Sequence, residues 1–141
     1  KLGRLLDYYH RGSLDLPDGL IARQCVFSAN GVSFEQTLGS ATAAPLRRML
    51  GRGPAAYRFL AQGLCYALPD GVLCLEELVG AEGGGLGTGL ATIRGTPRGA
   101  NAPLVADVDV ALVTDNEGRL VEVGIQIAEP VILALELARR A

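Results

Sequence analysis

The strands in the second half of the chain decide the fold, most clearly in residues 104–127, which read LVADVDVALVTDNEGRLVEVGIQI. Apolar residues alternate with small or polar ones on both sides of Asp115–Gly118, which is typical of two strands joined by a tight turn. Two similar runs, 72–80 and 86–96, come before this pair. Because short turns require antiparallel neighbours, residues 72–127 predict a four-stranded antiparallel meander.

Helical patterns flank this meander. The other expected elements, in chain order, are helices at 2–11 and 16–23, a strand at 25–27 with a hairpin turn at Asn30–Gly31 into 32–36, a helix from Pro54 to Leu68, and a last helix from Glu129. Helices followed by a strand meander are the α+β pattern, in which the helices pack on one face of the sheet. We therefore expect one domain over residues 1–141.

The stretch from Gly39 to Gly53 is rich in small residues and precedes the central helix. It predicts an excursion with one helical turn, which we interpret as a mobile lid over a pocket.

Composition narrows the classes of partner. The chain of 141 residues has a net charge of −2, which argues against nucleic acid. It has no apolar run of the roughly 20 residues that a membrane helix needs. Its three cysteines lack a CxxC spacing and are interpreted as reduced thiols in a cytoplasmic protein.

The chain lacks the motifs that bind common cofactors. It has no phosphate-binding loop, dinucleotide fingerprint, HExxH sequence or cysteine–histidine metal pattern, and His10 is its only histidine. We therefore expect neither a metal nor an organic cofactor.

Two acidic residues stand on one face of the strand at 104–114. Asp107 and Asp109 alternate with the apolar Val108 and Val110, so the carboxylates share a face. If the apolar face is the core, both aspartates face water or a subunit contact. If their own face lines an apolar pocket, desolvation and mutual repulsion raise at least one pKa and leave a neutral hydrogen-bond donor.

Tyrosines on helical faces are the other candidate donors. Tyr9 and Tyr57 both lie on predicted apolar helix faces. Such a ring is either part of the core or a donor within a pocket, and the pattern leaves both interpretations open.

The order and spacing of several short sequences resemble the cone-fold superfamily named after nuclear transport factor, which includes SnoaL-like polyketide cyclases, ketosteroid isomerases and limonene-type epoxide hydrolases. The sequences that carry the resemblance are Tyr9–His10–Arg11–Gly12, Leu68–Pro69–Asp70, Gly95–Thr96–Pro97–Arg98–Gly99, Val108–Asp109–Val110 and Asn116–Glu117–Gly118–Arg119–Leu120. The resemblance implies a cone-shaped molecule, with the curved, mostly antiparallel sheet wrapped around helices and one apolar pocket.

The resemblance also implies roles for individual residues. Asp109 matches the pocket aspartate of the isomerases, which an apolar site keeps neutral so that it donates a hydrogen bond. Tyr9 and Tyr57 lie near positions of pocket tyrosines in that family. The aspartate that acts as the general base in the isomerases corresponds to a position near Ala29 of this chain, so the resemblance implies that the base is missing here. The substrate-binding residues expected around the pocket are Phe27, Phe59, Leu60, Asp107, Val123, Ile125 and Ile127.

These residues favour a cyclase or isomerase that acts on a hydrophobic, polyketide-derived intermediate in the biosynthesis of a natural product such as an antibiotic. Without a base, holding the substrate in a reactive conformation supplies the acceleration, and Asp109 polarises a carbonyl. One alternative is an epoxide hydrolase that uses Asp107 and Asp109, and the other is a non-catalytic module that binds a small ligand or a partner. The sheet face that carries Glu122, Gly124 and Gln126 points away from the helices and predicts a homodimer.

Overall fold

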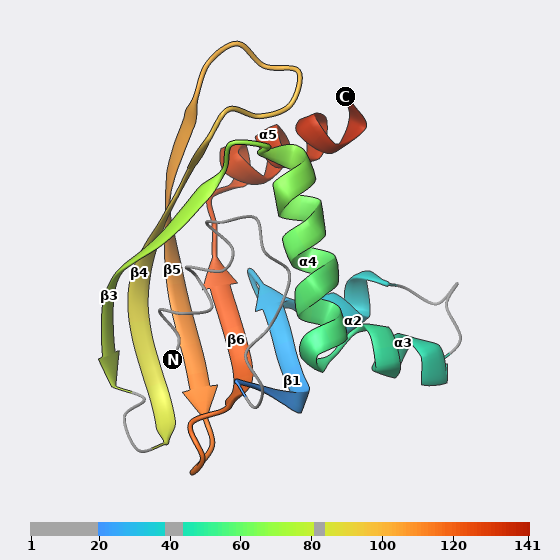
Figure 1. Cartoon of the computed structure of the whole chain (residues 1–141), viewed down its shortest axis with the longest axis vertical. Coiled ribbons are helices and arrows are strands. Elements are labelled where there is room, and N and C mark those ends of the chain that lie inside the picture. Colours follow the sequence, from blue (N-terminus) through green and yellow to red (C-terminus); the bar gives the residue numbers. More distant parts are fainter. Residues whose placement is uncertain (1–19, 39–43, 81–83) are drawn as a thin grey trace.

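The computed structural model describes residues 20–38, 44–80 and 84–141 (Figure 1). In chain order its elements are β1 (Ile21–Ala29), β2 (Val32–Ser33), α2 (Phe34–Thr37), α3 (Ala44–Leu50), α4 (Gly53–Ala67), β3 (Val72–Gly80), β4 (Gly85–Gly95), β5 (Leu104–Thr114), β6 (Leu120–Gln126) and α5 (Glu129–Arg140). The strands of these residues form one sheet in the order β2–β1–β6–β5–β4–β3. Neighbouring strands are antiparallel except β1 and β6, which run parallel.

The meander β3–β4–β5–β6 confirms the prediction for the second half of the chain, with strand limits within one residue of those expected. The turn between β5 and β6 is held by Asp115, whose Oδ1 accepts hydrogen bonds from the backbone N–H groups of Glu117 and Arg119, each at 2.9 Å. The Arg119 Nε donates to Asp115 Oδ2, also at 2.9 Å. This turn makes β5 and β6 adjacent and fixes their register.

The hairpin turn at Asn30–Gly31 is confirmed. Both residues have positive φ, 52° and 83°, as a two-residue turn of this hand requires. The predicted strand over 32–36 is wrong beyond Ser33, because the side chains of Ser33 and Gln36 form a reciprocal capping box that starts α2. The Asn30 side chain also donates to the carbonyl oxygen of Ile127 (3.0 Å) and accepts from its N–H (2.9 Å), which joins the hairpin to the end of β6.

The predicted helix over 16–23 is wrong in its last residues. Ile21 begins β1 and pairs with Leu120 of β6, and both Leu20 and Ile21 are buried in the core. Burial against the sheet therefore outweighs the weak helical spacing. The remainder of that helix, the helix at 2–11 and the start of the predicted lid at 39–43 lie outside the described residues. Within the predicted excursion, α3 is longer than the single turn expected.

Helix α4 confirms the expected central helix, with Pro54 in its first turn. It begins at Gly53, whose φ is +66°, and a Cβ built there would overlap the carbonyl oxygen of Arg23 in β1. The preceding residue, Arg52, donates its Nε to Glu35 Oε2 at 2.7 Å. The close approach of Gly53 places the start of α4 against β1, and the ion pair joins it to α2.

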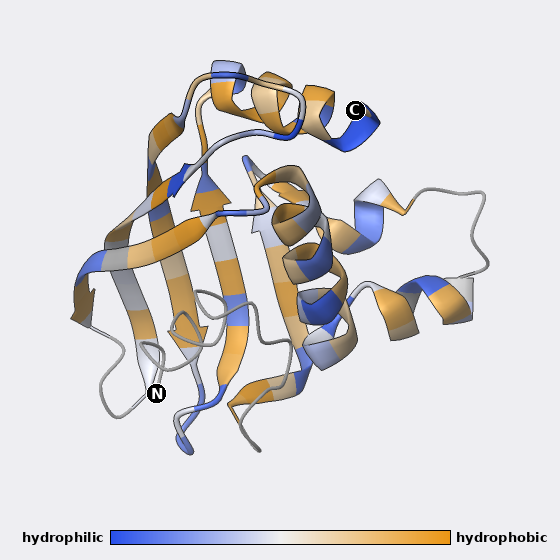
Figure 2. Cartoon of the chain, turned by 45° about the horizontal axis from the view of Figure 1, so that its top comes forward, coloured by the Kyte–Doolittle hydropathy of each residue, from blue (hydrophilic) through white to orange (hydrophobic). Residues whose placement is uncertain are grey.

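The two faces of the sheet differ in character. We call the face against α4 the inner face, because Cys25, Phe27 and Leu112 form one buried cluster there with Ala56 of α4. A second cluster on this face joins Val108 to Leu68, the residue at the end of α4. Figure 2 shows the alternation of apolar and polar residues along the strands. We call the opposite face the outer face.

Helix α5 confirms the expected last helix and lies near the C-terminal end of α4 (Figure 1). Its Leu135 packs against the second buried cluster. The Tyr66 hydroxyl of α4 donates to the carbonyl oxygen of Ala141 at 3.0 Å, and the Arg98 guanidinium lies 4.2 Å from the centre of the Tyr66 ring. Within the described ranges, no helix combines the length and the apolar character needed to span a membrane.

Candidate functional site

Tyr57 is the polar group that α4 buries toward the inner face. Its ring packs against the cluster that contains Phe27 and Leu112. Its hydroxyl oxygen is buried and has no hydrogen-bond partner among the described residues. A buried donor left unpaired costs about 1–3 kcal/mol, so such groups need a specific explanation. A donor held free in apolar surroundings is suited to binding a polar atom of a ligand.

The cluster against which the Tyr57 ring packs has further apolar neighbours. Val110 of β5 and Val123 of β6 are half-buried and pack against the same cluster as Tyr57 and Phe27. We call Phe27, Tyr57, Val110 and Val123 the Tyr57 site. The apolar surface continues along the inner face through the second buried cluster, against which Ile125 and Ile127 pack. The site therefore combines one hydroxyl group with an extended apolar wall.

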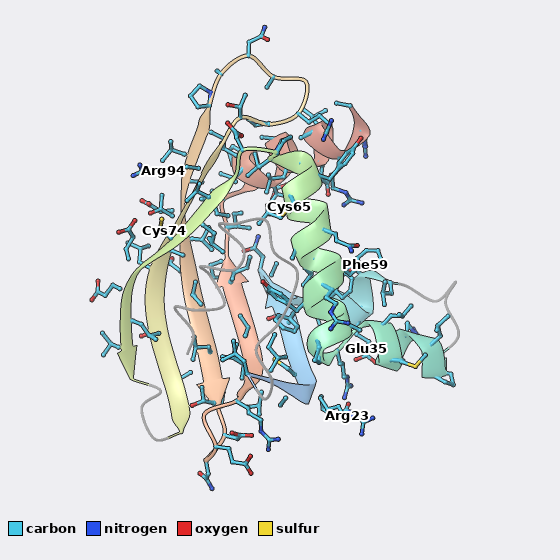
Figure 3. The ribbon with its side chains drawn as sticks, in the orientation of Figure 1. Arg23, Glu35, Phe59, Cys65, Cys74 and Arg94 are labelled. Carbon is cyan, nitrogen blue, oxygen red and sulfur yellow. The ribbon has the colours of Figure 1, made fainter. Side chains whose placement is uncertain are left out.

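Burial sets the protonation of the groups near this site. It raises the pKa of the Tyr57 phenol, and the nearby Cys65 thiol raises it further. Burial also raises the pKa of Cys65, on the side of α4 that faces the sheet (Figure 3). For the completely buried Cys25, burial, followed by the charge of Glu122, raises the pKa to about 12. Near neutral pH the phenol therefore acts as a donor, and the thiols are poor nucleophiles.

Asp107 and Asp109 lie on the outer face, so the expectation that they face the apolar pocket is wrong. Both are exposed, whereas Val108 between them is buried on the inner face. Asp109 stands opposite Gln126 of β6. Because successive side chains of a strand point to opposite faces, a difference of one position reverses which residue faces inward. Burying Val108 is favourable, whereas burying two carboxylates without partners is costly.

Asp109 instead borders a shallow hollow on the outer face, with a volume of about 620 Å³. The side chains around it come from five strands and include Ser28, Glu77, Thr88, Leu90, Asp109 and Gln126. Asp107 lies two residues closer to the start of β5 and does not line this hollow. Its Oδ1 is 3.5 Å from the hydroxyl oxygen of Thr92. Neither carboxylate is near Tyr57, which lies across the sheet.

Phe59 and Leu60 were also expected to shape the pocket, and both are exposed. Phe59 is 59% exposed and lies on the side of α4 away from the sheet (Figure 3), where its ring centre is 5.6 Å from that of Phe34. A helix that is apolar nearly all round does not reveal which side meets the sheet. Tyr9, the remaining predicted donor, lies outside the described residues.

Val110 and Cys65 also lie at or near the Tyr57 site, and neither was predicted from the sequence. The signal for Val110 was present, because it belongs to the all-apolar face of β5 that also carries Val108 and Leu112. Cys65 lies eight residues after Tyr57, about two helical turns along α4 and rotated by roughly 80° about its axis. In the residues that the structure describes, no group of three or more His, Cys, Asp or Glu side chains is arranged to hold a metal ion.

The chain matches no protein-family model and no curated protein. Its similarity is to solved structures. IdmH, a candidate polyketide cyclase from Streptomyces antibioticus, is 23% identical with a TM-score of 0.64, and the match covers 96% of this chain and 94% of IdmH. SalBIII, an epoxide hydrolase/cyclase-like enzyme in pyran ring formation in the polyether salinomycin, is 9% identical with a TM-score of 0.64, covering 92% of this chain and 88% of SalBIII.

An NTF2-like protein of unknown function from an Exiguobacterium species is 13% identical with a TM-score of 0.64, and the match covers 91% of this chain and 98% of that protein. Identities this low show the fold alone. The chain therefore has the NTF2-like cone fold, with a curved sheet around helices, as its sequence predicted.

Proposed function

We propose that this protein is a cyclase or isomerase that acts on a hydrophobic, polyketide-type substrate bound at the Tyr57 site. The observation that carries the proposal is the buried Tyr57 hydroxyl, which has no partner in the described chain. The same fold serves the candidate polyketide cyclase IdmH and the cyclase-like enzyme SalBIII, which supports the class of reaction.

In this proposal the apolar walls hold the substrate in a conformation close to that of the product. Fixing a flexible chain in this way removes much of the entropic barrier to ring closure. The Tyr57 hydroxyl donates a hydrogen bond to a substrate carbonyl and stabilises the charge that develops on its oxygen. Tyr57 thus takes the polarising role first expected of Asp109. Thr92 is the only buried polar or charged residue of the described chain, so none of its carboxylates is buried, which favours a closure that needs no strong base.

The two alternatives differ in what they require. An epoxide hydrolase needs ionised acids beside an activated water, and the candidate acids Asp107 and Asp109 lie on the outer face. A binding module needs only the apolar pocket, and it would hold the substrate without changing it. No observation on the described residues favours either alternative over ring closure.

The proposal is tested with linear intermediates accumulated by a strain that lacks this gene. We expect the purified protein to convert one of them into a product of the same mass with a new ring, detected by mass spectrometry and NMR. Binding without conversion would identify a binding module. A product heavier by one water would identify a hydrolase.

We further propose that two copies pair through the outer face. Three apolar residues of this face are each more than 60% exposed, Val79 and Leu86 near one end of β4 and Val105 beside its other end. A symmetric dimer is the usual way to cover such a surface. We expect light scattering to give the mass of a dimer at micromolar concentration, and Val105→Glu to give a folded monomer. A monomeric wild-type protein at every concentration would contradict this.

A further inference from the structure

Charge is divided unevenly along the chain. Residues 20–68 contain five arginines and a single acidic residue, Glu35, whereas residues 69–141 contain five arginines and eleven acidic residues. The described part of the first segment forms β1, β2, α2, α3 and α4, and the second forms the meander and α5. Although the net charge of the chain is only −2, the segment 20–68 is basic and the segment 69–141 is acidic.

A cleft opens in the basic region between β1 and α3. It has a volume of about 600 Å³ and is lined by Arg23, Gln24, Pro45, Met49 and Arg52. Arg52 is paired with Glu35, whereas Arg23 is exposed and forms no salt bridge within the described residues. Figure 3 shows Arg23 on the opposite side of the molecule from Arg94. We call this feature the α3 cleft.

Exposed apolar residues accompany the arginines. Met49 lines the cleft and is 65% exposed, and Leu46 and Leu50 of the same helix are exposed as well. Arginine and methionine are enriched where proteins meet, and both line this cleft. The α3 cleft therefore has the composition of a protein-docking surface for an acidic partner.

We infer that the α3 cleft docks an acidic carrier protein, which delivers the hydrophobic substrate as a thioester on a flexible arm. The inference rests on the proposed function, because the carrier would deliver the apolar substrate of that reaction. Arg52 lines the cleft, and Tyr57 follows five residues later on α4, about 8 Å along a helix axis. A carrier docked at the α3 cleft thus places the end of its arm within reach of the Tyr57 site.

Other anionic partners fit the cleft less well. Binding to a lipid bilayer commonly inserts the apolar face of an amphipathic helix, and α3 has only seven residues to insert. Tight binding to a nucleic acid duplex commonly uses about 6–10 phosphate contacts, more than this one cleft supplies. An acidic helix with an apolar contact matches both the charge and the shape.

Binding is measured by thermophoresis with two recombinant, strongly acidic holo acyl carrier proteins, at low and at physiological salt. We expect micromolar affinity that weakens as salt screens the charges. Arg23→Glu and Met49→Ala should each weaken binding by about tenfold, because they remove a charge contact and an apolar contact. Arg94→Glu, on the far side of the molecule, is the matched control and should bind like wild type. Circular dichroism establishes that each variant is folded.

Conversion of the free substrate separates this inference from the proposed function. Arg23→Glu should convert free substrate at the wild-type rate and carrier-bound substrate more slowly. Carrier binding without any conversion would support the docking site and contradict the proposed function. The docking site is overturned by binding that is absent or independent of salt, by equal losses in Arg94→Glu, or by tighter binding to anionic vesicles or to duplex RNA. A dimer that Arg23→Glu dissociates would also overturn it, because the proposed outer-face dimer does not involve the cleft.

Discussion

Replacing Tyr57 with phenylalanine is expected to slow the reaction and to stabilise the protein. The change removes a buried hydroxyl that has no partner in the described residues and keeps the ring that packs against the core. Loss of one hydrogen bond to the reacting carbonyl should lower turnover by about ten- to a hundredfold. Relief of the unpaired hydroxyl should raise the free energy of unfolding by about 1 kcal/mol. Turnover assays and urea denaturation measure the two effects.

Tyr66→Phe is the matched control on the same helix. The Tyr66 hydroxyl is bonded to the Ala141 carbonyl, away from the Tyr57 site. Its removal should leave turnover unchanged and lower stability by a few tenths to about 1 kcal/mol. An active Tyr57→Phe variant would exclude the phenol as the polarising donor. A clear loss of stability in that variant would mean that the hydroxyl is paired in the folded protein.

Gly53→Ala is expected to destabilise the protein by about 2–4 kcal/mol. The left-handed backbone of Gly53 costs other residues about 1–2 kcal/mol. The added methyl group would also overlap the Arg23 carbonyl, which belongs to the backbone and cannot move without displacing β1. The start of α4 would have to shift, and with it Tyr57, so turnover should fall as well. The midpoint of urea denaturation reports the change in stability.

Gly63→Ala is the control for this change, because it adds the same methyl group within α4. A Cβ at Gly63 has no atom within 4 Å, and its φ is not in the left-handed region. Alanine should therefore stabilise the helix by about 0.5–1 kcal/mol. The two substitutions differ in sign, and a Gly53→Ala variant as stable as wild type would show that α4 does not need this close approach to β1.

Elements with strong local signals were predictable from the sequence. The meander was predictable, because the alternation of its strands and the turn residues between them, such as Asp115 and Gly118, agree over more than fifty residues. Helix α4 was predictable, because Pro54 and Pro69 mark its two ends. The end of β2 was not predictable, because the capping box of Ser33 and Gln36 starts α2 where the pattern continues the strand.

The site was predictable only in part, because a pattern gives which residues share a face but not which face is covered. The alternation in β5 separated Asp109 from Val108 and Val110, and either face was compatible with a pocket. The structure settles the choice by packing Val108 beside the end of α4 and leaving Asp109 exposed. The same ambiguity misplaced Phe59 on the nearly all-apolar α4. Tyr57 was among the candidates, but the burial of its hydroxyl without a partner among the described residues depends on tertiary packing that local sequence does not encode.

The parallel pairing of β1 with β6 constrains the order in which the protein folds. Phe27 of β1 pairs with Val123 of β6, so most of the described chain separates the two strands. Contacts between such distant residues form late, because closing a long loop costs entropy before it gains contacts. On the ribosome β1 has no neighbour on this side until β6 has been made, whereas the hairpins of the meander form from local contacts. The Tyr57 site and the α3 cleft both depend on β1, so they are completed in the last step of folding.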